Sequence, residues 1–177
     1  MRDDYRITIG LTNPKSPTNV GAVLRAAGCF QADSILYTGN RYDRAAAYCT
    51  DTQNLIETIP LTAVDCLLES APEGAEIVVI ELAENAESLA DFNHPKNAFY
   101  IFGPEDGSVK QKVVNQANSV VYIPTKGCLN LAATVNVVLY DRLAKYSERE
   151  EGRELIIQSR DVNNRLKVKQ RITTPVL

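Results

Sequence analysis

The feature that most constrains the fold is the alternation of short apolar, β-branched segments with segments typical of helices. Two central segments, residues 76–82 and 98–102, have apolar side chains at consecutive positions. Such runs are typical of strands covered on both faces, as in parallel sheets. The sequence therefore predicts an α/β fold with a mostly parallel sheet and helices on both faces. The expected strands are residues 5–11, 34–38, 76–82, 98–102 and 120–123, and the expected helices are residues 20–30, 63–68, 109–117 and 131–146.

Polar residues stand where these helices are expected to begin. The side chain of such a residue accepts a hydrogen bond from an otherwise unpaired amide in the first turn. The expected caps are Thr18 or Asn19 for the first helix, Thr62 for the second and Ser108 for the third, and Asn130 stands at the start of the fourth.

Length and charge limit the domain organisation and the partners. The 177 residues, 45% of them apolar, suit one core. We assign residues 1–147 to the main part of this domain and residues 148–177 to a C-terminal extension with a basic tail. A net charge of −3 argues against binding of nucleic acid through bulk charge, so an RNA ligand needs local basic patches. The tail's basic residues are Arg160, Arg165, Lys167, Lys169 and Arg171.

Several other function classes lack their sequence signatures. The four cysteines show no C-x-x-C spacing and the one histidine, His94, is far from them, so we expect no metal site and a surface loop position for His94. Scattered cysteines without a leader sequence indicate reduced thiols in the cytoplasm, and no segment is long enough to span a membrane. Sequence motifs of dinucleotide-binding proteins, P-loop NTPases and serine hydrolases are absent. The cysteines are Cys29, Cys49, Cys66 and Cys128.

The first segment that helix and strand building leaves unexplained runs from residue 13 to residue 27. Asn19 lies at a helix start, Gly21 in its first turn, and Arg25 about one turn further on. A helix N-terminus and a guanidinium can together hold a phosphate. A capped helix with a surface arginine explains the same residues equally well.

Two further segments follow expected strands, where open α/β sheets bind ligands. After residue 102, a turn with two glycines and Glu105 leaves the backbone open to an adenine or a ribose. After Ile123, a proline and a polar loop lead to Asn130 at the start of an apolar helix. Taken without regard to ligands, the same segments are a turn before a helix and the start of a core helix.

In order and spacing, the three segments resemble the three motifs of the SpoU/TrmH branch of the SPOUT RNA methyltransferases. The similarity extends from the first expected strand to the last long helix. The matching residues are Asn19, Gly21 and Arg25 in the first segment, Phe102, Gly103 and Glu105 in the second, and Ile123, Pro124, Leu129, Asn130 and Leu131 in the third.

The resemblance implies an S-adenosylmethionine-dependent enzyme that methylates a ribose 2′-hydroxyl of tRNA or rRNA. It implies a C-terminal trefoil knot and a homodimer with the active site at the subunit interface. Arg25 takes the catalytic role, as a base or as a phosphate clamp, with Asn19 and Glu105 holding the reacting groups and Asn130 fixing the third loop. Main-chain groups near five residues would hold the cofactor: Leu82, Gly103, Ile123, Cys128 and Leu129.

We expect the RNA contacts to come from the catalytic domain itself. The candidates are Lys15, Arg41, Arg44, Lys126 and the basic tail, each of which can equally be solvated surface. One departure from the family pattern is Cys128, which stands where serine is usual. Two alternatives remain open: a SAM-binding or RNA-binding module without catalysis, and a different small α/β enzyme that acts on nucleotides.

Overall fold

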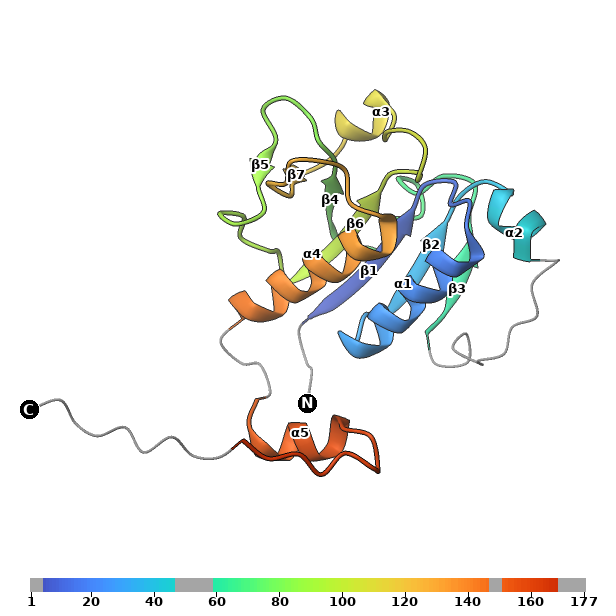
Figure 1. The fold of residues 1–177 in the computed structure, drawn as a ribbon. Coiled ribbons are helices and arrows are strands. Elements are labelled where there is room, and N and C mark those ends of the chain that lie inside the picture. Colours follow the sequence, from blue (N-terminus) through green and yellow to red (C-terminus); the bar gives the residue numbers. More distant parts are fainter. Residues whose placement is uncertain (1–4, 47–58, 147–150, 169–177) are drawn as a thin grey trace, which may run out of the picture. The chain divides into compact units, whose positions relative to one another are not determined.

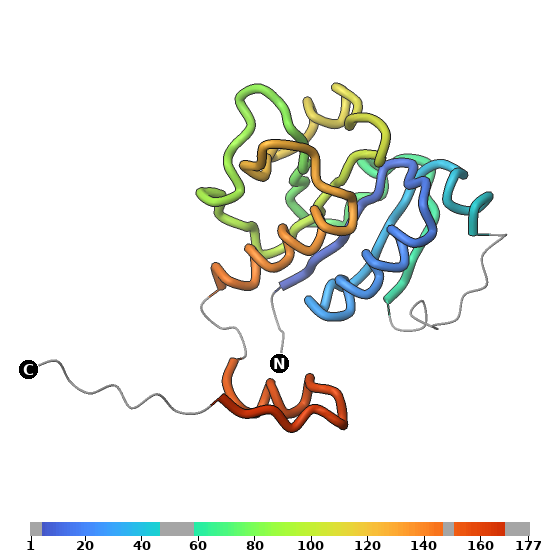
Figure 2. Tube along the Cα trace, viewed as in Figure 1, coloured from blue at the N-terminus to red at the C-terminus, as the bar shows by residue number. Residues whose placement is uncertain are grey.

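The computed structural model describes residues 5–46, 59–146 and 151–168, and the chain forms two compact units, Met1–Tyr146 and Ser147–Leu177 (Figures 1 and 2). In the second unit, the described residues form one helix, α5 (Arg153–Ser159), none of whose side chains is buried. Its membership in the same domain stays a prediction. Lys169 and Arg171 of the basic tail lie outside the described residues, as does Cys49.

A seven-stranded sheet organises the described part of the first unit. Its order is β3-β2-β1-β6-β4-β7-β5, and every pairing is parallel, which confirms the predicted α/β fold. The strands are β1 (Arg6–Leu11), β2 (Ser34–Tyr37), β3 (Leu61–Ala63), β4 (Glu76–Ile80), β5 (Glu87–Ser88), β6 (Asn97–Phe102) and β7 (Ser119–Tyr122).

Helices cover one face of the sheet more fully than the other. Helices α1 (Pro17–Cys29) and α4 (Leu131–Lys145) run side by side over one face and share its apolar core (Figure 1). A second core on the other face lies under the short helix α3 (Gln111–Val114) and the turns after β3. Helix α2 (Arg41–Ala46) follows β2. The trefoil knot stays a prediction.

The predicted helix after Thr62 is wrong. Thr62 lies in the edge strand β3, where it pairs in parallel with Leu36, and turns follow the strand. The backbone amide of Ile35 donates to the carbonyl of Pro60 over 2.8 Å, which extends this pairing. Hydrogen bonding to the sheet outweighs a local capping signal here, since β-branched threonine also suits a strand.

Two predicted caps are also wrong. Helix α1 begins at Pro17, and the hydroxyl of Ser16 accepts from the Asn19 amide over 3.3 Å. Proline fits the first helical position because its missing N–H would be unpaired there. The third helix begins only at Gln111, after Lys110 rather than Ser108, because the Val109 amide donates to the Glu81 carboxylate over 2.9 Å. Asn130 lies at the start of α4 as predicted, and its side chain caps the helix.

His94 does not have the surface position that the sequence suggested. Its side chain is only 1% exposed and lies between β6 and α4. Arg142 donates to the Tyr100 hydroxyl (3.0 Å), which lies 2.6 Å from His94 Nδ1, while Nε2 lies 2.9 Å from the Asp141 carboxylate. Lys145 forms an ion pair with the same carboxylate at 2.8 Å. A neutral imidazole satisfies both contacts, as an acceptor at Nδ1 and a donor at Nε2.

This network predicts that the protein loses stability in mild acid. Burial, opposed by the hydrogen bond to Asp141 and assisted by the charge of Arg142, lowers the pKa of His94 below its ordinary 6.5. The unfolded chain then binds a proton that the folded chain does not, so stability falls as the pH drops below about 6.5, by up to about 1.4 kcal/mol per pH unit.

Urea unfolding between pH 7.5 and 5.5 measures this slope. The matched variant, His94→Gln, carries no titrating group and should show a flatter profile. An equal slope in both proteins would contradict the assignment to His94.

Candidate functional site

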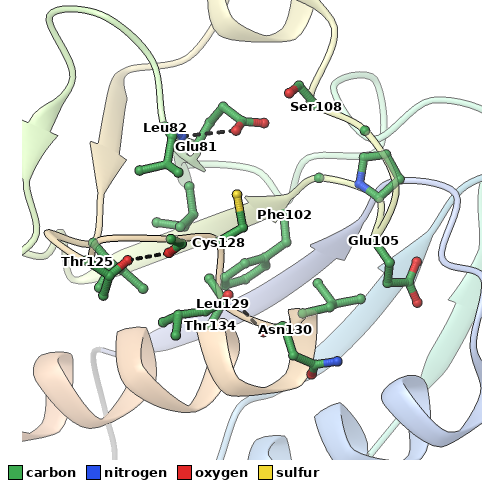
Figure 3. A pocket seen from close by; sticks show the side chains of 17 residues that line it. Glu81, Leu82, Phe102, Glu105, Ser108, Thr125, Cys128, Leu129, Asn130 and Thr134 are labelled. Atoms are coloured by element: carbon green, nitrogen blue, oxygen red, sulfur yellow. Dashed lines mark hydrogen bonds between the residues drawn. The ribbon is translucent and has the colours of Figure 1, made fainter.

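A cavity of about 410 Å³, here called the first cavity, lies at the carboxyl edge of the sheet. The loops after β4, β6 and β7 and the start of α4 line it (Figure 3). The parallel sheet brings these loops together because all its strands end at the same edge. All five residues expected to contact a cofactor line this cavity, namely Leu82, Gly103, Ile123, Cys128 and Leu129.

Glu81, which the sequence reasoning missed, fixes two of these loops. Its carboxylate accepts from the amides of Leu82 (3.0 Å) and Val109 (2.9 Å). A Cβ on Gly103 would lie 3.3 Å from the Glu81 carboxylate and 3.4 Å from the Val109 nitrogen, so glycine lets the loops after β4 and β6 approach closely. A carboxylate directly after a buried strand was the available sequence signal.

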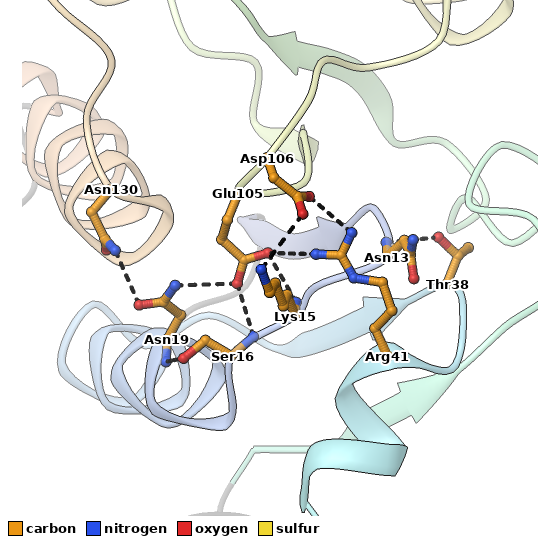
Figure 4. A network of polar contacts seen from close by, with 9 residues as sticks. All are labelled: Asn13, Lys15, Ser16, Asn19, Thr38, Arg41, Glu105, Asp106 and Asn130. Atoms are coloured by element: carbon orange, nitrogen blue, oxygen red, sulfur yellow. Dashed lines mark hydrogen bonds and ion pairs between the residues drawn. The ribbon is translucent and has the colours of Figure 1, made fainter.

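A chain of hydrogen bonds connects the three motif segments (Figure 4). The Glu105 carboxylate, in the loop after β6, accepts from the amides of Lys15 (2.9 Å) and Ser16 (3.1 Å) and from the Asn19 side chain (3.1 Å). The Asn130 side chain donates to the side-chain amide oxygen Oδ1 of Asn19 over 3.1 Å. Three of the four residues expected to be catalytic therefore lie together.

Glu105 is held in its charged form. Burial by itself raises the pKa of this carboxyl, but the hydrogen bonds from its own amide, the Asn19 side chain and the Ser16 and Lys15 amides outweigh burial and hold it below its ordinary value. A carboxylate with both oxygens accepting hydrogen bonds is a poor proton acceptor. Its evident role is to join the loop after β6 to the start of α1.

Arg25, the fourth residue, lies apart from this network along α1. Arg25 lies six positions after Asn19. This spacing places the two residues about 120° apart around the helix and about 9 Å apart along it. Its side chain is exposed. Within one chain, therefore, Arg25 is presented to the surface rather than to Glu105.

Two expected RNA contacts form ion pairs within the chain. Arg41 donates to Asp106 over 2.8 Å and lies 3.8 Å from Glu105, while the Lys15 ammonium lies 3.8 Å from Asp106. The hydrogen bond and charge of Arg41 lower the pKa of Asp106. Arg44 and Lys126 are exposed.

A family comparison identifies the chain. Residues 6–140 match the model of the SpoU rRNA methylase family. The chain belongs to that family. This confirms the resemblance drawn from the three motifs, whereas no curated protein matches the sequence.

Solved structures show the same fold in the SpoU family. The AdoMet-bound rRNA methyltransferase from Sinorhizobium meliloti is 18% identical with a TM-score of 0.67, over 81% of this chain and 57% of that one. The SpoU methyltransferase AviRb from Streptomyces viridochromogenes is 18% identical with a TM-score of 0.64, over 80% and 61%. The A. aeolicus TrmH/SpoU tRNA modifying enzyme is 21% identical with a TM-score of 0.66, over 78% and 76%. This chain thus spans about three fifths of the first two.

The described residues hold no cluster of three or more metal-binding side chains. Within the same residues, no helix is long and apolar enough to cross a membrane. Cys29, Cys66 and Cys128 are free thiols.

The Glu105 network predicts a stability cost for an isosteric change. In Glu105→Gln, an amide N–H₂ faces backbone donors and one accepted hydrogen bond is lost, so the free energy of unfolding should fall by about 1.5–3 kcal/mol. The control is Asp106→Asn, because Asp106 is 51% exposed and such pairs contribute about 1 kcal/mol or less. Urea unfolding at pH 7 compares the two, and equal losses would contradict a special role for Glu105.

Proposed function

We propose that this SpoU family chain transfers a methyl group from S-adenosylmethionine to a ribose 2′-hydroxyl of tRNA or rRNA in the cytoplasm. The observation that carries the proposal is the first cavity, in which three loops bring together all five expected cofactor contacts. Free cysteines in the described residues support a reducing compartment.

The first cavity fits the cofactor in size and chemistry. Its volume of about 410 Å³ is in the range of small-molecule sites. The apolar side chains of Leu82, Ile123 and Leu129 suit an adenine, and the open backbone at Gly103 suits hydrogen bonds to the adenine and the ribose. S-adenosylmethionine supplies a methyl group made electrophilic by its sulfonium charge.

The protein's own residues position the acceptor. Glu105 holds Asn19, and with it the start of α1, beside the first cavity. Asn130 at the start of α4 donates to the same Asn19 side chain. A guanidinium has N–H donors and no acceptor, so we assign Arg25 as a clamp on the phosphate next to the target ribose rather than as a base. Arg44 and Lys126, both exposed, are further candidate phosphate contacts.

A homodimer would bring the exposed Arg25 of one subunit to the site of the other. Val137 and Tyr140 support this arrangement, because they are large apolar side chains one turn apart on α4 and are 38% and 64% exposed. Such a pair on a helix beside the active-site loops suits burial against a second copy.

The dimer predicts that Tyr140→Asp dissociates the protein into monomers, since a buried unpaired charge is costly at an interface. Tyr140→Phe is the control and should leave the dimer intact. Sedimentation equilibrium measures the mass of each. A monomeric parent protein, or a dimeric Tyr140→Asp, would argue against this interface.

The activity is tested by calorimetry with S-adenosylhomocysteine and by methylation of RNA from cells that lack the chain. We expect one site per chain with micromolar affinity, about −8 kcal/mol. Arg25→Ala should keep this affinity and lose methyl transfer about a hundredfold or more, because a misplaced acceptor reacts poorly.

The outcomes separate the alternatives. Cofactor binding without methylation of any cellular RNA would indicate a binding module that lacks catalysis. A folded protein that binds no S-adenosylhomocysteine would point to a different α/β function. Full activity in Arg25→Ala would refute the role assigned to Arg25.

A further inference from the structure

A second cavity, of about 870 Å³, lies at the same edge of the sheet. It is lined by the loops after β1, β2 and β3, whereas the first cavity is lined by the loops after β4, β6 and β7. Pro104 and Ser108 line both cavities. The turn after β6 is therefore a wall between two cavities, only one of which the cofactor needs.

The lining of the second cavity combines an aliphatic surface with hydrogen-bonding groups. Its apolar residues are Ala63, Val64, Leu67, Leu68 and Val113. Its polar side chains include the amides of Asn13 and Asn40, the hydroxyl of Thr38 and the carboxylate of Asp65. Ligand sites commonly have such an apolar lining with a few polar groups that fix orientation.

The walls of this cavity are preformed. The backbone N–H of Asn13 donates to the Thr38 hydroxyl over 3.2 Å (Figure 4). The backbone N–H of Thr38 donates to the Leu11 carbonyl over 3.1 Å, so the loops after β1 and β2 are tied together. Gly39, at φ +77°, lies against Asn13 so closely that a Cβ there would collide with it. A ligand would therefore meet a fixed surface.

One polar atom of this lining is left unsatisfied. The Thr12 hydroxyl is buried and has no hydrogen-bond partner within the described part of the chain. Buried polar atoms in native proteins nearly always have a partner, and one left without a protein partner calls for a ligand or a water. Thr12 is among the residues that line the second cavity, although this hydroxyl oxygen itself has almost no accessible surface.

We propose that the second cavity binds the base of the RNA nucleotide that receives the methyl group, an inference that rests on the proposed function. A base has flat apolar faces, which suit the aliphatic lining, and an edge of donors and acceptors, which suits amide, hydroxyl and carboxylate groups. Lys110, exposed at the cavity, can meet a phosphate. A base on one side of the Pro104–Ser108 wall places its own ribose near the cofactor on the other side, as methyl transfer requires.

Cys66 provides a probe, since it is a free, half-buried thiol that lines the second cavity. A protein with the other three cysteines replaced by serine is alkylated with iodoacetamide in the presence of AMP, GMP, CMP or UMP. At about ten times its Kd, a nucleotide that fills the cavity slows alkylation about tenfold, since only the free cavity reacts. The matched control keeps only Cys29, which is exposed at the end of α1.

We expect at least one of the four nucleotides to protect Cys66 and none to protect Cys29. Prior modification of Cys66 with N-ethylmaleimide should abolish binding of that nucleotide and leave the affinity for S-adenosylhomocysteine unchanged. Failure of all four nucleotides to protect Cys66, or equal protection of Cys29, would overturn the inference.

Protection is measured with and without S-adenosylhomocysteine, so it decides on the second cavity independently of the first. Cofactor binding without protection of Cys66 would refute the base site and leave the proposed function standing. Absence of cofactor binding would count against the proposed function itself.

Discussion

The arrangement of the loops at the carboxyl edge of the sheet depends on the Glu105 carboxylate. It lies at the point in the sheet where the order of the strands reverses. The connection after β1 leads to β2 on one side, and the connection after β6 leads to β7 on the other. The loops after β1 and β6 therefore diverge, and Glu105 joins them through the Lys15 and Ser16 amides. Its bond to Asn19, and that of Asn130 to Asn19, extend the connection to α1 and α4. The same bridge separates the two cavities.

Helix α4 is held at both ends, and the two attachments differ in chemistry. At its start, Asn130 caps the helix and bonds to Asn19, which fixes the start of α4 against the start of α1. Near its end, Arg142 is 3% exposed, and its guanidinium donates to the carbonyls of Pro95 and Lys96 and to the Tyr100 hydroxyl. A buried cation is tolerable only with such satisfied donors. The Arg142 contacts thus fix the end of the helix, while the Asn130 contacts fix its start beside the first cavity.

The sequence was sufficient for what depends on local pattern and order along the chain. Apolar runs located the central strands, and the second and third of the spaced motifs marked most of the lining of the first cavity. Features set by distant partners could not be predicted. The edge strand at Thr62 exists because β2 offers hydrogen bonds, and His94 is buried because α4 brings Asp141 to it. The second cavity forms where three loops meet, and these loops share no sequence motif. A local sequence pattern therefore could not predict it.

Charge alone does not explain how RNA would bind here. The chain carries a net charge of −3, and Asp106 forms ion pairs with Lys15 and Arg41 beside the site. An approaching phosphate has to compete with that carboxylate, which weakens any binding that depends on backbone charge. In the proposed function, discrimination between RNAs would depend more on groups that read a base, such as those proposed for the second cavity. The proposed base site in the second cavity therefore suits this acidic chain better than a general affinity for RNA would.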